Sequence, residues 1–129
     1  MTAATGFVLY LVLTLVLLGA VVVTGKKSLR RKHLTFVVLA YVGLGLSIYY
    51  AELLGKEYNF DSVRLIYDVH MAFAKATVCA YLLPIITGIM TIKGKCTRTT
   101  HGRVAVAVIL LTVVTAVTGW WMILAATPL

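Results

Sequence analysis

The side chains best suited to chemistry in this chain are its three histidines, His33, His70 and His101. A neutral imidazole nitrogen is a common axial ligand of haem iron. Two such ligands, one on each face of the haem, require two histidines on different helices at similar depth. His33 and His101 meet this requirement if each opens a helix, so we expect them to ligate the iron of haem b. The alternative is that both are interfacial residues beside basic loops.

Basic side chains flank both of these histidines. Arg31 and Lys32 precede His33, and Arg103 follows His101. We expect these cations to pair with the propionates of a haem. Small residues that would leave room for the flat macrocycle follow one and two turns deeper: Ala40, Gly43 and Ala105.

His70 lies in a different segment and is expected near the opposite membrane surface. The first apolar segment has no histidine that could pair with it. We expect His70 to be a ligand completed by a methionine such as Met122 or by a partner subunit, or a quinol contact near Tyr67 and Tyr81. The alternative is a structural histidine that is hydrogen-bonded across the bundle.

The elements that must position these residues follow from composition. The chain has 129 residues, of which 61% are hydrophobic and 12% charged, with a net charge of +8. A soluble domain carries about 25% charged residues, and a nucleic-acid-binding surface needs many more bases than this, so no nucleic-acid partner is expected. Continuous apolar runs predict membrane-spanning helices over residues 5–25, 33–53, 68–92 and 103–125. We expect an all-α, up-down-up-down four-helix bundle that forms a single transmembrane domain, residues 1–129.

The distribution of charges predicts the orientation of this bundle. Nine of the twelve bases fall in the first and third connections, whereas all four acids fall in the second. By the positive-inside rule both basic loops are cytoplasmic and both termini lie outside, in the periplasm if the membrane is a bacterial inner membrane. Aromatic residues gather at the predicted outer interface: Tyr49, Tyr50, Tyr58, Phe60, Tyr67, Trp120 and Trp121.

Small and weakly polar residues predict which faces of the helices pack together, because membrane helices approach closely where side chains are short. The second helix carries such a stripe at His33, Ala40, Gly43, Ser47 and Ala51. The third carries one at His70, Ala74, Thr77, Tyr81, Ile85 and Gly88, and the fourth at His101, Ala105, Thr112, Thr115 or Ala116, and Gly119. All three histidines share these faces. Pro84 predicts a kink in the third helix because it frees the carbonyl of Ala80.

A spacing shared by two helices suggests a family. His101 is followed by Thr118 and Gly119, and His70 by Thr87 and Gly88 at nearly the same interval. These histidine-led helices that end in a Thr-Gly pair resemble the compact four-helix membrane cytochromes of the cytochrome b-five-six-one kind. The resemblance covers the last three helices. It implies haem b held between helices two apart in the chain, and electron exchange with quinol or a partner redox protein.

The sequence therefore leaves two alternative functions. The first is a membrane electron-transfer protein or subunit that binds haem b, with a quinone as a second cofactor. The second is a non-catalytic structural or assembly subunit of a respiratory or photosynthetic complex, which would contact the lipid bilayer and other subunits. The chain is also similar to small histidine-bearing membrane proteins linked with respiratory oxidase assembly. No nucleophile, base and orienting group occur in a catalytic pattern, so catalytic residues are not expected.

Overall fold

The computed structural model describes residues 1–129, and four of its helical segments are long and apolar enough to span a membrane: Ala3–Lys26, Arg30–Gly55, Asp61–Ile92 and Arg98–Ala125. They begin two to seven residues before the predicted spans. Between 11% and 22% of the residues in their most apolar stretches are buried within the chain. Most apolar side chains therefore face outward, as expected of a multi-pass integral membrane protein.

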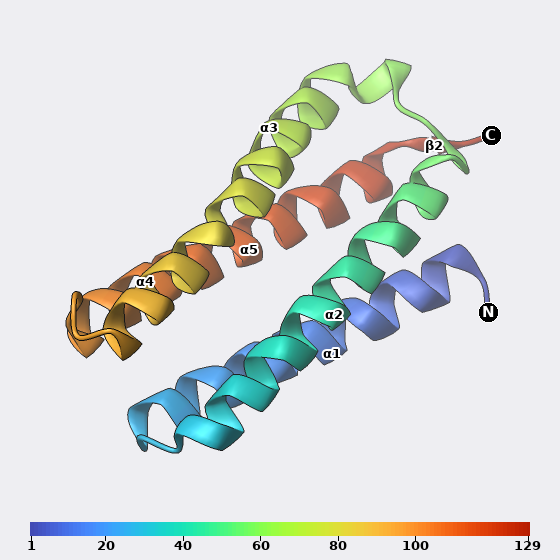
Figure 1. The fold of residues 1–129 in the computed structure, drawn as a ribbon. Coiled ribbons are helices and arrows are strands. Elements are labelled where there is room, and N and C mark those ends of the chain that lie inside the picture. Colours follow the sequence, from blue (N-terminus) through green and yellow to red (C-terminus); the bar gives the residue numbers. More distant parts are fainter. The chain divides into compact units, whose positions relative to one another are not determined.

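The chain divides into two compact units, residues 1–58 with Leu129, and residues 59–128. In the first unit, α1 (Ala3–Lys26) and α2 (Arg30–Gly55) form an antiparallel hairpin (Figure 1). Ser28 adopts a left-handed conformation, with φ 59°, in the tight turn that joins them. Two short strands, β1 (Tyr58–Asn59) and β2 (Thr127–Pro128), form a two-stranded sheet.

Helices α1 and α2 pack closely at Thr14 of α1. A Cβ atom added at Gly43 would lie 2.8 Å from the Thr14 hydroxyl oxygen, and Ser47 Oγ lies 3.3 Å from the same oxygen. Ala40, Gly43 and Ser47 are all buried, which confirms the predicted packing stripe of α2. The prediction that Gly43 leaves room for a macrocycle is wrong, because Thr14 occupies the space above it.

The second unit contains a short 3₁₀ turn, η1 (Asp61–Val63), followed by α3 (Arg64–Ala80), α4 (Leu82–Ile92) and α5 (Arg98–Ala125). Helices α3 and α4 run along α5 in the opposite direction (Figure 1). The break between them falls at Tyr81, which agrees with the kink predicted from Pro84 because proline cannot bond the carbonyl four residues earlier. The buried Tyr81 hydroxyl lies 2.8 Å from Thr112 Oγ1 and ties this break to α5.

A threonine pair adds a second polar contact to this interface. Thr77 Oγ1 lies 2.6 Å from Thr115 Oγ1, and Thr77 and Thr112 are buried. The predicted stripes of α3 and α5 are confirmed at these positions. Ile85 is an exception, since 39% of its surface is exposed. The helix restarts at Leu82, and the stripe returns to α5 at Gly88, which lies under the ring of His101.

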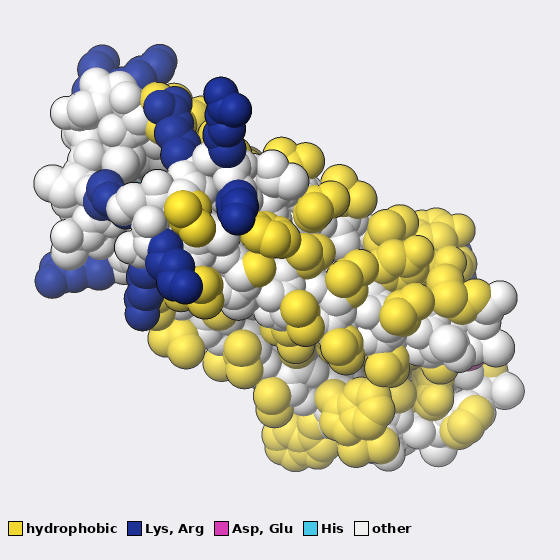
Figure 2. Space-filling view, turned by 90° about the horizontal axis from the view of Figure 1, so that it is seen from below, with side chains coloured by type: hydrophobic (Ala, Val, Ile, Leu, Met, Phe, Trp, Pro, Cys, Tyr) yellow, Lys and Arg dark blue, Asp and Glu magenta, His cyan; other side chains and the backbone are white.

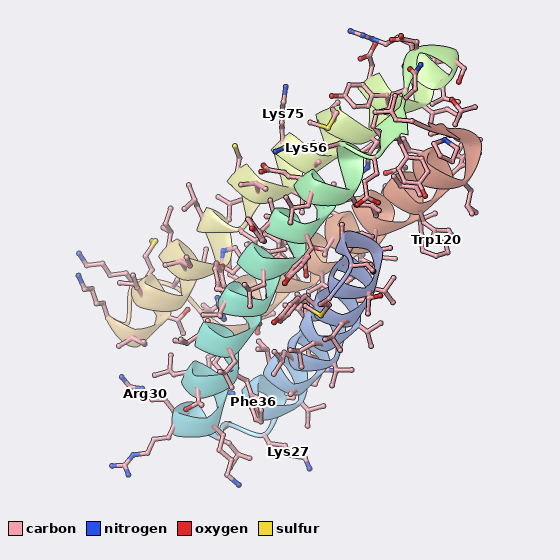
Figure 3. The ribbon with its side chains drawn as sticks, turned by 90° about the vertical axis from the view of Figure 1, so that its right-hand side faces the viewer. Lys27, Arg30, Phe36, Lys56, Lys75 and Trp120 are labelled. Carbon is pink, nitrogen blue, oxygen red and sulfur yellow. The ribbon has the colours of Figure 1, made fainter.

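On the face shown in Figure 2, Lys and Arg side chains gather at helix ends and apolar side chains cover the helix bodies. Lys27 and Arg30 flank the turn between α1 and α2 (Figure 3). Lys75 is exposed and points away from α3 (Figure 3). Arg64 and Asp68 form an ion pair at 3.3 Å, but both are largely exposed, so the pair contributes under about 1 kcal/mol.

Candidate histidine sites

His33 is the fourth residue of α2 and reaches back to α1. Its Nδ1 lies 3.0 Å from the carbonyl oxygen of Val21. Because a carbonyl oxygen can only accept, Nδ1 must carry the hydrogen, and the neutral ring then holds its lone pair on Nε2. The ring rests on Gly25, where an added Cβ would lie 3.2 Å from His33 Cε1.

His101 occupies the same position in α5, four residues from its start, and contacts α4. Its Nδ1 lies 3.0 Å from Thr87 Oγ1. That hydroxyl has one hydrogen, which it donates to the carbonyl of Leu83 at 2.8 Å. Thr87 Oγ1 is therefore the acceptor for His101 Nδ1–H, and the lone pair of the neutral ring again lies on Nε2. The ring covers Gly88, with 3.3 Å between Cε1 and an added Cβ.

His70 of α3 repeats this arrangement against α5. Its Nδ1 lies 3.2 Å from Thr118 Oγ1. Thr118 donates its own hydroxyl hydrogen to main-chain carbonyls one turn earlier in α5. Its Oγ1 lies 3.0 Å from the carbonyl oxygen of Val114 and 3.0 Å from that of Thr115. The Thr118 hydroxyl therefore accepts from His70 Nδ1–H, and the Thr115 carbonyl is a further hydrogen-bond partner of the ring. Gly119 lies directly under the ring, since an added Cβ would be 2.8 Å from His70 Cε1.

The three histidines thus share one local structure, which we call the Thr-Gly contact: a ring on one helix packed on a Thr-Gly pair of the antiparallel helix. The chain has four Thr-Gly pairs, and the fourth, Thr5-Gly6, lies under the ring of Tyr50. Of the six other glycines, five have no such neighbour within 4 Å of an added Cβ. The Thr-Gly pair is therefore specifically associated with a ring and is not a general small-residue feature.

The signal for two of these contacts was present in the sequence as the interval from histidine to Thr-Gly. His70 precedes Thr87 by 17 residues, and His101 precedes Thr118 by the same number. Two antiparallel helices with this pattern place each histidine against the other helix's Thr-Gly pair. Seventeen residues of helix span about 26 Å, close to the thickness of a membrane core. The two contacts therefore lie at opposite ends of the second unit.

The structure places the predicted site residues in separate units. His33 lies in the first unit and His101 in the second, and their joint ligation of one haem stays a prediction. The flanking Arg31, Lys32 and Arg103 are exposed near the starts of their helices. Among residues 1–129, no group of three or more His, Cys, Asp or Glu side chains could hold a metal ion.

His70 makes the cross-helix hydrogen bond that its structural alternative expects. Met122, the methionine named as a second ligand, is buried on α5 one turn beyond Gly119. The Tyr81 hydroxyl, named as part of a quinol contact, is engaged with Thr112. The ligand and quinol roles of His70 stay predictions.

Comparison with known proteins identifies no family for this chain. No protein-family model, curated protein or solved structure matches the chain. The likeness to cytochrome b-five-six-one therefore stays an expectation carried by the histidine and Thr-Gly spacing.

The close packing of His70 on Gly119 predicts a specific sensitivity to a methyl group. Gly119→Ala should destabilise the protein by about 1–3 kcal/mol relative to Gly102→Ala, because the new Cβ overlaps the imidazole. Gly102 lies on the same helix with nothing within 4 Å of an added Cβ, so it controls for helix propensity. Thermal unfolding in detergent measures the difference. Equal stability of the two variants would contradict the described packing.

Proposed function

We propose that this protein is a membrane electron-transfer protein or subunit that binds haem b through His33 and His101 and exchanges electrons with quinol or a partner redox protein. The observation that carries the proposal is the hydrogen bonding of Nδ1. His33 donates to Val21 O and His101 to Thr87 Oγ1, so each ring directs its lone pair through Nε2. An imidazole whose second nitrogen donates to an oxygen is typical of metal-ligating histidines.

The donor set suits haem in two further respects. Two neutral imidazoles are the ligands of low-spin haem centres, which supply single-electron transfer when the group is bound. The exposed cations Arg31, Lys32 and Arg103 would pair with its propionates. These cations lie within two residues of the proposed ligands, so the carboxylates and the iron would be held by the same helix starts.

The second candidate is a structural or assembly subunit that binds no haem. The wide apolar surface of the four spans favours it, since at most 22% of the residues in any span's most apolar stretch are buried within the chain. Such a surface serves lipid or partner helices equally well. Purification in mild detergent discriminates the two candidates: a colourless protein that copurifies only with partner subunits would support this one.

A reduced-minus-oxidised absorption spectrum tests the haem proposal. We expect the wild-type protein to show a b-type haem signal, and His33→Ala and His101→Ala to lose it because each removes one of the two residues that would hold the iron. Gly102→Ala is the matched control, since Gly102 is next to His101 on α5 and has nothing within 4 Å of an added Cβ. An absent wild-type signal, or an unchanged signal in both ligand variants, would refute the proposal.

We also propose the orientation that the charges predict, with both basic loops cytoplasmic and both termini outside, in a bacterial inner membrane. Eleven of the twelve bases are exposed residues outside the middle of any span, and five of them stand between residues 26 and 32. Moving such a cluster across the membrane is unfavourable, so it stays on the cytoplasmic side.

Cysteine labelling tests this orientation. In a Cys79→Ser background, Cys96 of the connection between α4 and α5 should react with a membrane-impermeant maleimide only after spheroplasts are permeabilised. With Cys96→Ser and Asn59→Cys added, the new thiol in the second connection should react in intact spheroplasts. The reverse pattern would show that the basic loops lie outside.

A further inference from the structure

We propose that Thr87 is a positioning residue: it accepts the Nδ1–H of His101 and thereby fixes Nε2 as the ligand-binding nitrogen of that histidine. For His101 this inference rests on the proposed haem ligation. His70 repeats the contact with Thr118, but its ring also bonds the Thr115 carbonyl, so His70 serves here as the comparison.

The direction of the threonine hydrogens carries the first step. A threonine inside a helix can donate its hydroxyl hydrogen to the carbonyl four residues earlier. Thr87 does so to Leu83 and Thr118 to Val114. With its hydrogen committed along its own helix, each hydroxyl offers only lone pairs to the facing helix. The histidine must then supply the hydrogen of the cross-helix bond.

The second step concerns the glycine of each pair. Because it has no side chain, the histidine ring can lie close to the backbone of the facing helix. The shortest approach to the added Cβ is made by Cε1, the carbon between the two ring nitrogens, at Gly88 and at Gly119. A larger residue would push this edge of the ring away and lengthen the bond to the adjacent threonine. The glycine admits the ring, and at His101 the hydroxyl of Thr87 determines which nitrogen carries the hydrogen.

The third step comes from His33, whose Nδ1 also donates a hydrogen bond but to a different kind of acceptor. In the first unit Thr24 donates to the carbonyls of Ala20 and Val21, and His33 Nδ1 bonds the Val21 carbonyl itself. A carbonyl thus replaces the hydroxyl as acceptor, yet Nδ1 is again the donor. Hydrogen bonds of this kind raise the basicity of the opposite nitrogen and orient the ring.

The experiment uses ¹⁵N-labelled full-length protein in detergent, examined by histidine ring NMR before and after haem is added. In the wild type, His70 and His101 should be Nδ1–H tautomers. Thr87→Val, which keeps the side-chain shape but removes the acceptor, should shift His101 toward Nε2–H. Thr118→Val should leave His70 as the Nδ1–H tautomer, because the Thr115 carbonyl still accepts its hydrogen. Thr87→Ser should restore the wild-type state. Thr35→Val is the control, since Thr35 bonds only the carbonyl of Arg31 in its own helix.

Haem titration gives a second result. Thr87→Val should bind haem about 10-fold more weakly than wild type, as expected when a partner of a ligating histidine is lost. The serine variant and Thr35→Val should bind as the wild type does. If no variant binds haem while the tautomers respond as stated, the proposed function fails and the positioning role stands. A wild-type Nε2–H tautomer of His101, or a His101 tautomer unaffected by Thr87→Val, would overturn the positioning role.

Discussion

The packing of a ring on a Thr-Gly pair is the interaction on which both units depend. In lipid, apolar surface does not drive helices together, so association requires close approach and hydrogen bonds between helices. Gly25, Gly88 and Gly119 permit the approach of an imidazole, and an oxygen beside each glycine accepts its Nδ1–H. The contact therefore joins the two helices and also determines which ring nitrogen carries the hydrogen.

Between these contacts, hydroxyl groups complete the interfaces. Thr14 meets Ser47 in the first unit, and Tyr81 meets Thr112 beside the helix break in the second. The break at Tyr81 is tolerated in an apolar environment because its hydroxyl and the neighbouring threonines bond to α5. Each hairpin thus has polar contacts at its centre and ring contacts at its ends. The fourth Thr-Gly pair, under Tyr50, keeps this plan with a phenol ring in place of an imidazole.

Most of the fold could be predicted from the sequence, because a charge-free apolar run of about 20 residues allows little except a spanning helix. The stripes at Gly43, Ser47 and Thr112 were also predictable, since small and hydroxylated residues mark helix contacts. The exposure of Ile85 was not predictable, because the helix breaks at Tyr81, four residues earlier, although Gly88 one turn later again faces α5. The ring contacts were missed as well. They join residues on antiparallel helices, and only the interval from histidine to Thr-Gly pointed to them.

Haem ligation by His33 and His101 is tested most directly by two measurements on the oxidised, purified protein: its electron paramagnetic resonance spectrum and its haem content. Ligation by His33 and His101 predicts about one haem b per chain, with the low-spin ferric signal of an iron held between two imidazoles. A high-spin signal would show that at most one of these histidines reaches the iron. Pure, folded protein without haem would contradict the central claim outright.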